Sequence, residues 1–404
     1  MDRIIKFLVI IFWIVYSSQV AAEKLQKKDG YLYIATFNVF KLGAVDLKYT
    51  SGSNSEIIPA RIQNIANVLA VGDFDLIALQ EVAHGKGGEA AINDLIKNLK
   101  AVHNLEYKAI HSEHIGRGLM AEMITFLYDP NEISPQALEE NVLTNLIEIP
   151  GRDLVRSQWK AGNFDFTVIS AHLAWGNETH RIAGYEKIND ILHNPEKYSN
   201  DPDIIILGDF NRFGDSQTSV QKIKYDETKF IAPNITIFDP SFNTLKEVSK
   251  SHIMGKGVPN DNPQFISTTV AKNTFVYDAF LMTKDVDEEF DGDLFKPQYD
   301  IDFGVIVFDE KGGFGYQIGA DDLSHNALKE AYSDHRPLWF RFNTSRVSDS
   351  DRTNALQKYF TTKSGKRYHL HNCPRINASA ELKAWESIEQ LKVELYLPCK
   401  ICLD

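Results

Sequence analysis

Short apolar segments alternate with amphipathic segments along most of the chain. Runs rich in β-branched and aromatic residues, which are typical of strands, stand at positions 31–37, 75–79, 123–128, 164–171, 204–207, 275–282 and 336–342. After Pro59, apolar residues recur at helical spacing at Ile62, Ile65, Ala66 and Leu69. Further helices are predicted over residues 91–102 and 178–192. This mixture of strands and helices predicts a layered α/β fold between residues 29 and 343.

Polar side chains suited to catalysis recur where these predicted strands end. The set consists of Asn38, Glu81, His172, Asp209, Asn211, Asp278, Asp334 and His335. Taken singly, an aspartate after a strand is usually a helix cap or a turn residue, and a lone histidine is more often a satisfied core residue. In open α/β sheets, however, ligands collect where strands end. The joint pattern therefore indicates a shared active site.

The order and spacing of these motifs resemble the endonuclease/exonuclease/phosphatase superfamily and, within it, the deoxyribonuclease I-like enzymes. The motifs are TFN, QEV, AHL, GDFN, YD and SDHRP, and the resemblance covers nearly all of residues 30–343. It implies a four-layer α/β sandwich, in which two mixed β-sheets stack face to face with helices outside. One departure is Met123, which stands after Glu122 where the similar enzymes carry an arginine. We therefore expect one phosphate contact to differ.

The resemblance also implies a hydrolase of phosphodiesters that uses a divalent cation. A phosphodiester anion repels a hydroxide nucleophile, so the site needs a cation that neutralises charge. Mg²⁺ prefers oxygen ligands and keeps several waters, so one or two carboxylates suffice. Glu81 is the best ligand candidate, and the resemblance adds Asn38 and Asp334. Mn²⁺ and Ca²⁺ are the alternatives to Mg²⁺.

The other polar residues are expected to carry out the reaction. Asp209 and Asn211, two positions apart on one turn, would accept from the attacking water and orient it. His335 as an imidazolium would stabilise the charge of the transition state, and Asp278 would fix its tautomer. His172, which the resemblance pairs with the glutamate of the metal site, would protonate the leaving oxygen. Both Asp209 and His335 are candidates for the base.

The first residues have the pattern of a signal peptide over residues 1–22. A short charged head precedes an apolar run of about ten residues and a small-residue site for cleavage before Glu23. The run is much shorter than the roughly 20 residues that cross a bilayer, and an uncleaved anchor is the alternative. We therefore expect a secreted or periplasmic protein without stable membrane insertion.

Charge bears on the substrate, because 55 acidic residues outnumber 43 basic ones and give a formal net charge of −12. A protein that grips many DNA phosphates usually has a basic face. The balance therefore argues against a processive DNA binder but allows a nuclease that touches few phosphates. Arg181 is equally open to a phosphate contact and to an ion pair on a helix surface. The acidic segment 285–309 is expected to be a solvated excursion rather than a calcium site.

A small C-terminal module, residues 357–404, is expected after a polar linker over residues 346–356, so that the catalytic domain spans residues 23–345. The module contains every cysteine of the chain. It resembles the small zinc-binding module at the start of the Ada DNA-repair protein, and its locally basic composition suggests that it holds DNA.

Four side chains of this module have the number and type that a tetrahedral structural Zn²⁺ takes. They are His369, Cys373, Cys399 and Cys402. The alternative is a disulfide from Cys373 to one of the other two cysteines, which export from the cytosol would favour. Zinc leaves no thiol unpaired, and we take it as the first hypothesis.

Three functions are compatible with these patterns. The first is a DNA endonuclease that acts as a monomer on DNA, its substrate. The second is a hydrolase of the same fold that acts on sphingomyelin, an inositol phosphate lipid or a nucleotide, which the acidic charge favours. The third is a binding or toxin-like protein with a degenerate site, and the completeness of the catalytic set argues against it.

Overall fold

The computed structural model describes residues 24–44, 57–116, 121–138, 141–211, 235–238, 277–283, 285–289, 302–345, 359–362, 367–369, 382–385 and 397–398. The chain divides into two compact units, Met1–Thr344 and Ser345–Asp404, and each is described by itself. The predicted signal peptide, the predicted linker and all three cysteines lie outside the described residues.

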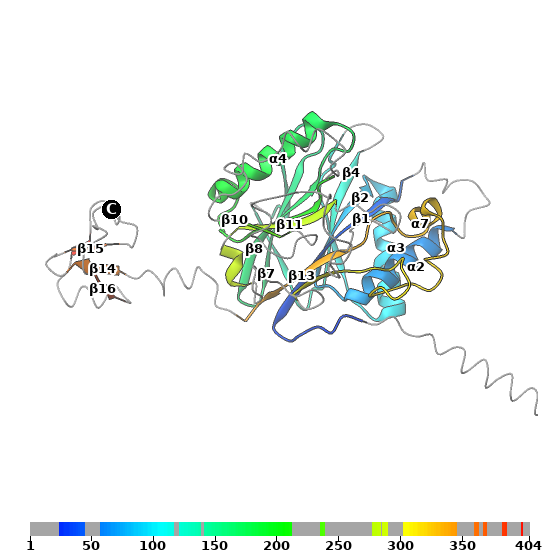
Figure 1. Cartoon of the computed structure of the whole chain (residues 1–404), viewed down its shortest axis with the longest axis horizontal. Helices are drawn as coiled ribbons and strands as arrows, with labels where there is room; N and C mark the ends of the chain where they lie inside the picture. The colour runs from blue at the N-terminus through cyan, green and yellow to red at the C-terminus, as the bar shows by residue number, and fades with distance from the viewer. Residues whose placement is uncertain are drawn as a thin grey trace, which may run out of the picture. The chain divides into compact units, whose positions relative to one another are not determined.

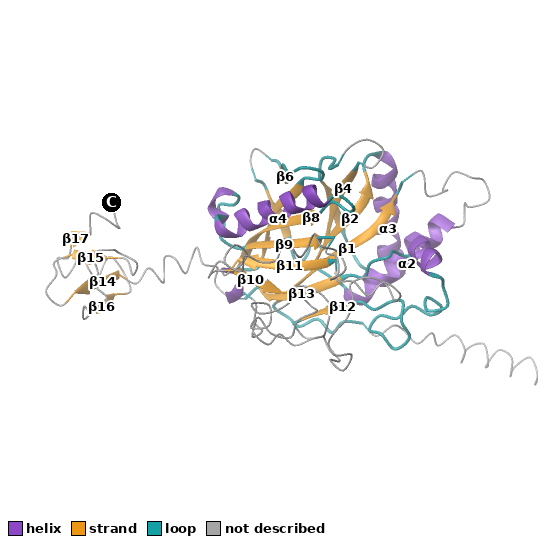
Figure 2. Cartoon of the chain, turned by 45° about the horizontal axis from the view of Figure 1, so that its top comes forward, coloured by secondary structure: helices purple, strands orange, loops and turns teal. Residues whose placement is uncertain are grey.

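A six-stranded mixed sheet forms one half of the large unit, in the order β12-β13-β1-β2-β4-β3. Figure 2 labels β12, β13, β1, β2 and β4 of this sheet. Its strands are β1 (Tyr31–Leu42), β2 (Leu76–Ala83), β3 (Lys108–His111), β4 (Glu122–Tyr128), β12 (Phe303–Val305) and β13 (Leu338–Asn343). β1 pairs in parallel with β2 and antiparallel with β13. The first and last described strands of the unit are therefore neighbours in space.

The second sheet has the order β10-β11-β9-β8-β7-β5, and β6 also pairs with β7. Its strands are β5 (Ser134–Gln136), β6 (Thr144–Ile147), β7 (Leu154–Ala161), β8 (Phe164–His172), β9 (Ile204–Asp209), β10 (Ile235–Phe238) and β11 (Asp278–Thr283). β8 and β9 are parallel, whereas β9 and β11 are antiparallel. This sheet is therefore mixed as well.

Alternation along the strands divides the core into three layers. Along β1, Leu32 and Ile34 face the second sheet, whereas Tyr33, Ala35 and Phe37 pack with the helices α2 and α3. The outer face of the second sheet packs against apolar residues of α4. The helices are α2 (Ile57–Gly72), α3 (Lys86–His103), α4 (Glu178–His193) and α7 (His325–Ala331), with short 3₁₀ turns at Pro195–Lys197 and Asp285–Glu288. Figure 1 shows the two sheets between α4 and the pair α2 and α3, so the predicted four-layer sandwich is confirmed.

The helices agree with the periodicity of the sequence and differ from it at one end. The four apolar positions predicted for the face of α2 are all buried. α3 begins at Lys86, five residues before the predicted start. Its first turn packs tightly against the end of β2, since a Cβ on Gly88 would lie 1.9 Å from the carbonyl oxygen of Ala83. α4 begins at Glu178 as predicted, and its N-cap Asn177 accepts a hydrogen bond from the backbone of His180 at 3.1 Å.

The expectation of a wholly solvated acidic segment at residues 285–309 is wrong for the described part. Asp302 and Asp309 are both buried. Arg341 of β13 donates to Asp302 at 2.8 Å, and Arg336 donates to Asp309 at 2.6 and 3.0 Å. The carboxylates are buried because each meets a guanidinium, which a local reading of charge does not reveal.

The small unit contains a four-stranded sheet in the order β16-β14-β15-β17. Its strands are β14 (Tyr359–Thr362), β15 (Arg367–His369), β16 (Leu382–Trp385) and β17 (Leu397–Pro398). His369 is the last residue of β15 and pairs with Phe360 in the register of β14. Among the described residues of the whole chain, no helix has the length and apolarity to span a bilayer.

Candidate active site

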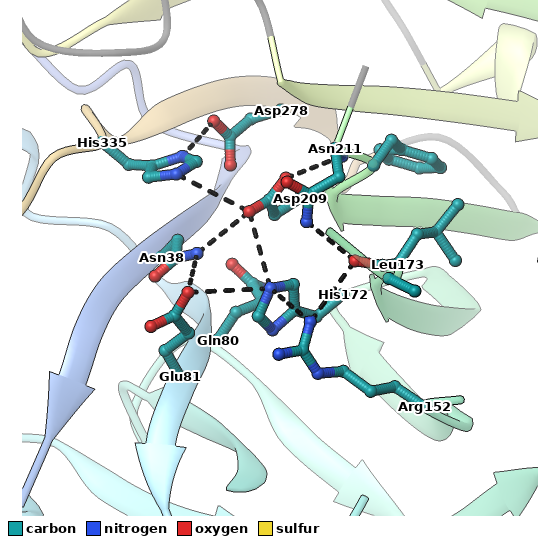
Figure 3. Close-up of polar contacts among 12 residues, drawn as sticks. Asn38, Gln80, Glu81, Arg152, His172, Leu173, Asp209, Asn211, Asp278 and His335 are labelled. Carbon is teal, nitrogen blue, oxygen red and sulfur yellow. Dashed lines mark hydrogen bonds and ion pairs between the residues drawn. The ribbon is translucent and has the colours of Figure 1, made fainter. Parts of the chain in front are cut away.

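Strand register brings the predicted polar residues to one end of the two sheets. His172 stands opposite Asp209 in the parallel pair of β8 and β9, and Asp278 stands opposite Asp209 in the antiparallel pair of β9 and β11. Asn38 of β1 stands opposite Gln80 of β2, which places Glu81 one residue further along that strand. Figure 3 shows these side chains turned toward one another across the gap between the two sheets.

Asp209 is the centre of the cluster and is only 1% exposed. Its Oδ2 accepts from Nδ2 of Asn38 at 3.0 Å and lies 3.6 Å from Nε2 of His335 and 3.7 Å from Nε2 of His172. Its Oδ1 accepts from the backbone N–H of Asn211 at 2.8 Å. One carboxylate oxygen therefore faces both imidazoles of the site (Figure 3).

Unusual backbone conformations orient two of the site residues. Glu81 has a φ of 59° and Asn211 a φ of 48°, in the left-handed region that L-residues rarely adopt. Such conformations cost of order 1 kcal/mol or more and are common at functional sites. The amide of Asn211 donates to the carbonyl of Leu173 at 2.7 Å, so its Nδ2 ties the end of β9 to the end of β8.

The expected metal ligands are only partly brought together. Asn38 donates to Oε1 of Glu81 at 3.1 Å, and the backbone of Lys41 donates to Oε2 at 3.2 Å. The Glu81 side chain stays 19% exposed, so it can still reach a ligand. Asp334 instead forms an ion pair with Lys329 at 3.3 Å. Within the described part of the chain, no three acidic, histidine or cysteine side chains cluster as a metal site.

This donor set nevertheless fits Mg²⁺. Mg²⁺ keeps several of its waters and takes one or two protein carboxylates, so a single oriented and partly exposed glutamate is enough to begin a site. Oxygen is also the only ligand type that Glu81 and Asn38 offer. The set would not suit a softer metal that requires sulfur ligands.

His335 is held as a cation between two carboxylates. Its Nδ1 donates to Oδ2 of Asp278 at 2.8 Å, and its backbone N–H donates to Oγ of Ser333 at 3.2 Å. Burial favours the neutral imidazole, but the charges of Asp278 and Asp209 outweigh burial and hold the pKa of His335 well above its usual value. The expected pairing of His335 with Asp278 is therefore present.

His172 is in the opposite electrostatic environment. Its Nδ1 contacts the carboxylate of Glu122, and its Nε2 lies 3.0 Å from Nη1 of Arg152. Burial and the charge of Arg152 lower the pKa of His172 to about 4. Because the guanidinium can only donate, Nε2 accepts and the ring proton sits on Nδ1. The partner that the resemblance predicted, Glu81, lies 3.7 Å away, so Glu122 is the direct partner.

Arg152 is the site residue that the sequence did not single out. It follows Gly151 in the connection between β6 and β7, and its Nε lies 3.4 Å from Oε1 of Glu122. Its side chain is 19% exposed, so a guanidinium faces the cluster while remaining within reach of a ligand. Met123, where the similar enzymes have an arginine, is buried in the core. The methionine at position 123 was the signal in the sequence that another residue would supply the guanidinium of the site.

Two further arginines donate hydrogen bonds to the backbone of segments next to the site. Arg61 of α2 is buried and donates to the carbonyls of Val39 and Phe40 at 2.7 and 2.6 Å, and also to that of Tyr332 at 3.3 Å. It thereby joins the end of β1 to the segment before His335. Arg181 is buried too, so it does not lie on the helix surface, and it donates to the carbonyl of Ala174 at 3.1 Å.

Comparisons with known proteins find similarity in solved structures alone. No protein-family model matches the chain, and no curated protein matches its sequence. The structure of D. rerio TDP2 complexed with single strand DNA product matches with a TM-score of 0.45 and 14% identity. The match covers 78% of this chain and 100% of the TDP2 chain. An endonuclease/exonuclease/phosphatase family protein from Bacteroides thetaiotaomicron has a TM-score of 0.43 and 14% identity, covering 78% and 98%. One from Leptotrichia buccalis has a TM-score of 0.43 and 18% identity, covering 76% and 98%.

These likenesses concern the fold and assign no activity. The four layers are defined by the strands, helices and cores of this chain itself. The chain thus has the fold expected from its resemblance to the endonuclease/exonuclease/phosphatase superfamily.

Proposed function

We propose that this chain is an exported hydrolase of phosphodiesters that depends on Mg²⁺ and cleaves DNA as an endonuclease. The observation that carries the proposal is the position of Asp209. One buried carboxylate oxygen faces the amide of Asn38, a cationic His335 and a neutral His172 within 3.0–3.7 Å. Two titratable groups whose pKa values are driven apart in one site are typical of acid–base catalysis.

Glu81 and Asn38 are the residues that would hold the cation. Bound there, Mg²⁺ supplies positive charge that offsets the repulsion between a phosphodiester and its nucleophile. Asn38 also donates to Asp209 and so sets the spacing between the two carboxylates. Asp334, the third ligand expected from the resemblance, pairs with Lys329 through Oδ2 and would compete with that ion pair for the cation.

Asp209 is the base in this proposal, because His335 is held in its charged form and has no free lone pair to accept a proton. A water that donates to Oδ2 of Asp209 would be oriented for attack on the phosphorus. His335 would then donate from Nε2 to a phosphoryl oxygen as negative charge develops on it. Asp278 keeps Nδ1 protonated, which leaves Nε2 directed at the reaction.

Arg152 is the residue that we propose binds the phosphate from the opposite side. Arginine recognises phosphate through paired N–H donors, and the side chain is partly exposed. A phosphate that takes over the N–H now directed at His172 would release Nε2 of that histidine. The freed Nε2 of His172 carries no proton of its own, but it lies 3.7 Å from Oδ2 of Asp209. It could therefore take over the proton that Asp209 receives from the attacking water and pass it to the leaving oxygen, while Glu122 holds the orientation of the ring.

DNA is preferred over other phosphoesters on the strength of the motif resemblance to deoxyribonuclease I-like enzymes. One of the similar solved structures, D. rerio TDP2, contains a single strand DNA product. The acidic net charge of −12 favours the alternative, a lipid or nucleotide phosphoester. Export rests on residues 1–22, and a structural Zn²⁺ in the small unit rests on His369 and the three cysteines, which are hypotheses from the sequence.

A plasmid nicking assay tests the proposal. Residues 23–404 are incubated with supercoiled plasmid in the presence of Mg²⁺ or of EDTA, alongside a His335→Ala variant whose folding is checked by circular dichroism. We expect nicking that requires the metal and that the variant lacks. A folded wild-type protein that leaves DNA intact but hydrolyses sphingomyelin or a nucleotide phosphodiester would refute the DNA assignment. Full activity in folded His335→Ala would refute the mechanism.

A further inference from the structure

One aromatic side chain stands out on the surface of the described residues. Four large apolar side chains are exposed there, namely Val102, Val142, Trp175 and Ile318, and Trp175 is the only aromatic one, at 69% exposed. Single exposed apolar residues are ordinary on protein surfaces. An exposed indole is less so, because tryptophan has a large apolar face that is usually covered by protein or ligand.

Trp175 belongs to the connection between β8 and α4, three residues after His172. Three residues of extended chain span at most about 11 Å, so the indole is attached within that reach of the catalytic cluster. The intervening Leu173 is buried, and both its backbone groups bond to the cluster: its N–H donates to the carbonyl of Asp209 at 2.9 Å, and its carbonyl accepts from Asn211 at 2.7 Å. The segment that carries Trp175 is thus anchored by the site itself.

The chain is also anchored on either side of the indole. The carbonyl of Ala174 accepts from the buried Arg181 at 3.1 Å. Gly176 follows with a φ of 73°, and Asn177 then caps α4. Trp175 is therefore presented from a fixed backbone. A fixed backbone lowers the conformational entropy that would be lost when a ligand covers the indole.

We propose that Trp175 is a stacking platform for a nucleobase of the strand being cleaved, an inference that rests on the proposed DNA substrate. Each base adds about 3.4 Å along one strand of a helix, so the reach of Trp175 covers bases about one to three positions from the scissile phosphate. Every base has a π-face, so such stacking tolerates any sequence. A stacked base must leave its partner, and the substrate is therefore single-stranded or opened at that position.

If DNA is the substrate, the net charge of −12 fits a binding contact that carries no charge of its own. A nuclease that cannot draw affinity from many phosphate contacts needs another source of binding energy. Stacking on tryptophan supplies it without positive charge, and cleavage kinetics should then depend only weakly on salt. Trp175 acts on binding rather than on the chemical step, so it is a substrate-binding residue and not a catalytic one.

The test compares Trp175→Ala and Trp175→Phe with the wild type on two oligonucleotides of equal length. One oligonucleotide has ordinary bases, and the other has abasic sites at the three positions on each side of a single cleavable phosphodiester. We expect Trp175→Ala to raise KM for the first oligonucleotide about 5- to 150-fold with little change in kcat, as loss of one base stack predicts. Trp175→Phe should restore most of the affinity, and all three proteins should cleave the abasic oligonucleotide alike.

Val102→Ala, which removes another exposed apolar side chain, is the matched control. It should leave KM unchanged for both oligonucleotides. An unchanged KM in Trp175→Ala on the base-containing oligonucleotide would overturn the stacking proposal, and so would an equal loss on both oligonucleotides. A wild-type protein that cleaves neither oligonucleotide would instead refute the proposed substrate. If Trp175→Ala then impaired hydrolysis of sphingomyelin vesicles, the indole would be a lipid contact and the base-stacking proposal would be wrong.

Discussion

Replacing Asp209 with asparagine is the sharpest test of the site, because the change preserves shape and removes one charge. The two carboxylate oxygens of Asp209 accept from the amide of Asn38 and from the backbone N–H of Asn211. Asn38 cannot turn to compensate, since its Oδ1 accepts from the backbone of Phe40 and its Nδ2 also donates to Glu81. Whichever way the new amide lies, its NH₂ therefore meets another donor.

The cost follows from that contact. A buried donor left without an acceptor costs about 1–3 kcal/mol, so Asp209→Asn should lower the free energy of unfolding by that amount. In a domain of this size, each kcal/mol lost from the free energy of unfolding lowers Tm by at most roughly 4 °C. The effect on catalysis is larger, because the base is lost: we expect kcat for plasmid nicking to fall about 10²- to 10⁴-fold.

Urea unfolding and nicking rates at saturating Mg²⁺ measure the two effects separately. Asp94→Asn on the exposed face of α3 is the matched control, since its carboxylate pairs only with the exposed Lys97 among the contacts described. It should change neither quantity. A folded Asp209→Asn protein that nicks DNA at the wild-type rate would refute the assignment of the base. Unchanged stability would refute the hydrogen-bond argument.

Three further predictions follow from individual side chains. Arg152→Met should lower kcat/KM for DNA about 10- to 100-fold, because a charged hydrogen bond to the phosphate is lost. An unchanged kcat/KM in steady-state kinetics would show that Arg152 does not bind the phosphate. Asp309→Asn should cost about 1–3 kcal/mol of stability in urea unfolding, because the buried Arg336 loses one charged partner and keeps the other, Glu310. Activity per folded molecule should persist, and unchanged stability would contradict this prediction. Met123→Arg should destabilise the fold by more than about 2 kcal/mol, as melting curves would show, and a stable variant with higher DNA affinity would disprove the burial argument.

The sequence predicted the layered fold and most residues of the polar cluster around Asp209, but it did not single out Arg152. β1 and β9 begin with continuous apolar runs, residues 31–35 and 204–207, because both faces of each sheet are covered, and α2 shows its buried face as a helical repeat. These are local signals. The motif residues were all predicted at strand ends, and the structure agrees only in part. His172 and Asp209 end β8 and β9, whereas Asp278 begins β11 and His335 precedes β13. Asn38 and Glu81 lie within the longer strands β1 and β2.

β7 shows where a local signal was present but weak. Val155, Ser157, Trp159 and Ala161 alternate with polar neighbours that are less buried, which is the period of a strand with one covered face. The charged and polar residues between them lower its mean hydropathy. Pairing with β8 in the second sheet makes this segment a strand.

Partnerships between distant side chains were decided only by the tertiary structure. Glu122 lies next to His172 because β4 and β8 belong to two different sheets that face each other, and no sequence period encodes that approach. Arg152 reaches the same histidine from a connection between strands. The burial of Asp309 likewise depends on Arg336, 27 residues away. Local patterns report which face of an element is buried, whereas the partner of a buried charge is fixed by sheet order and register, which the chain acquires only on folding.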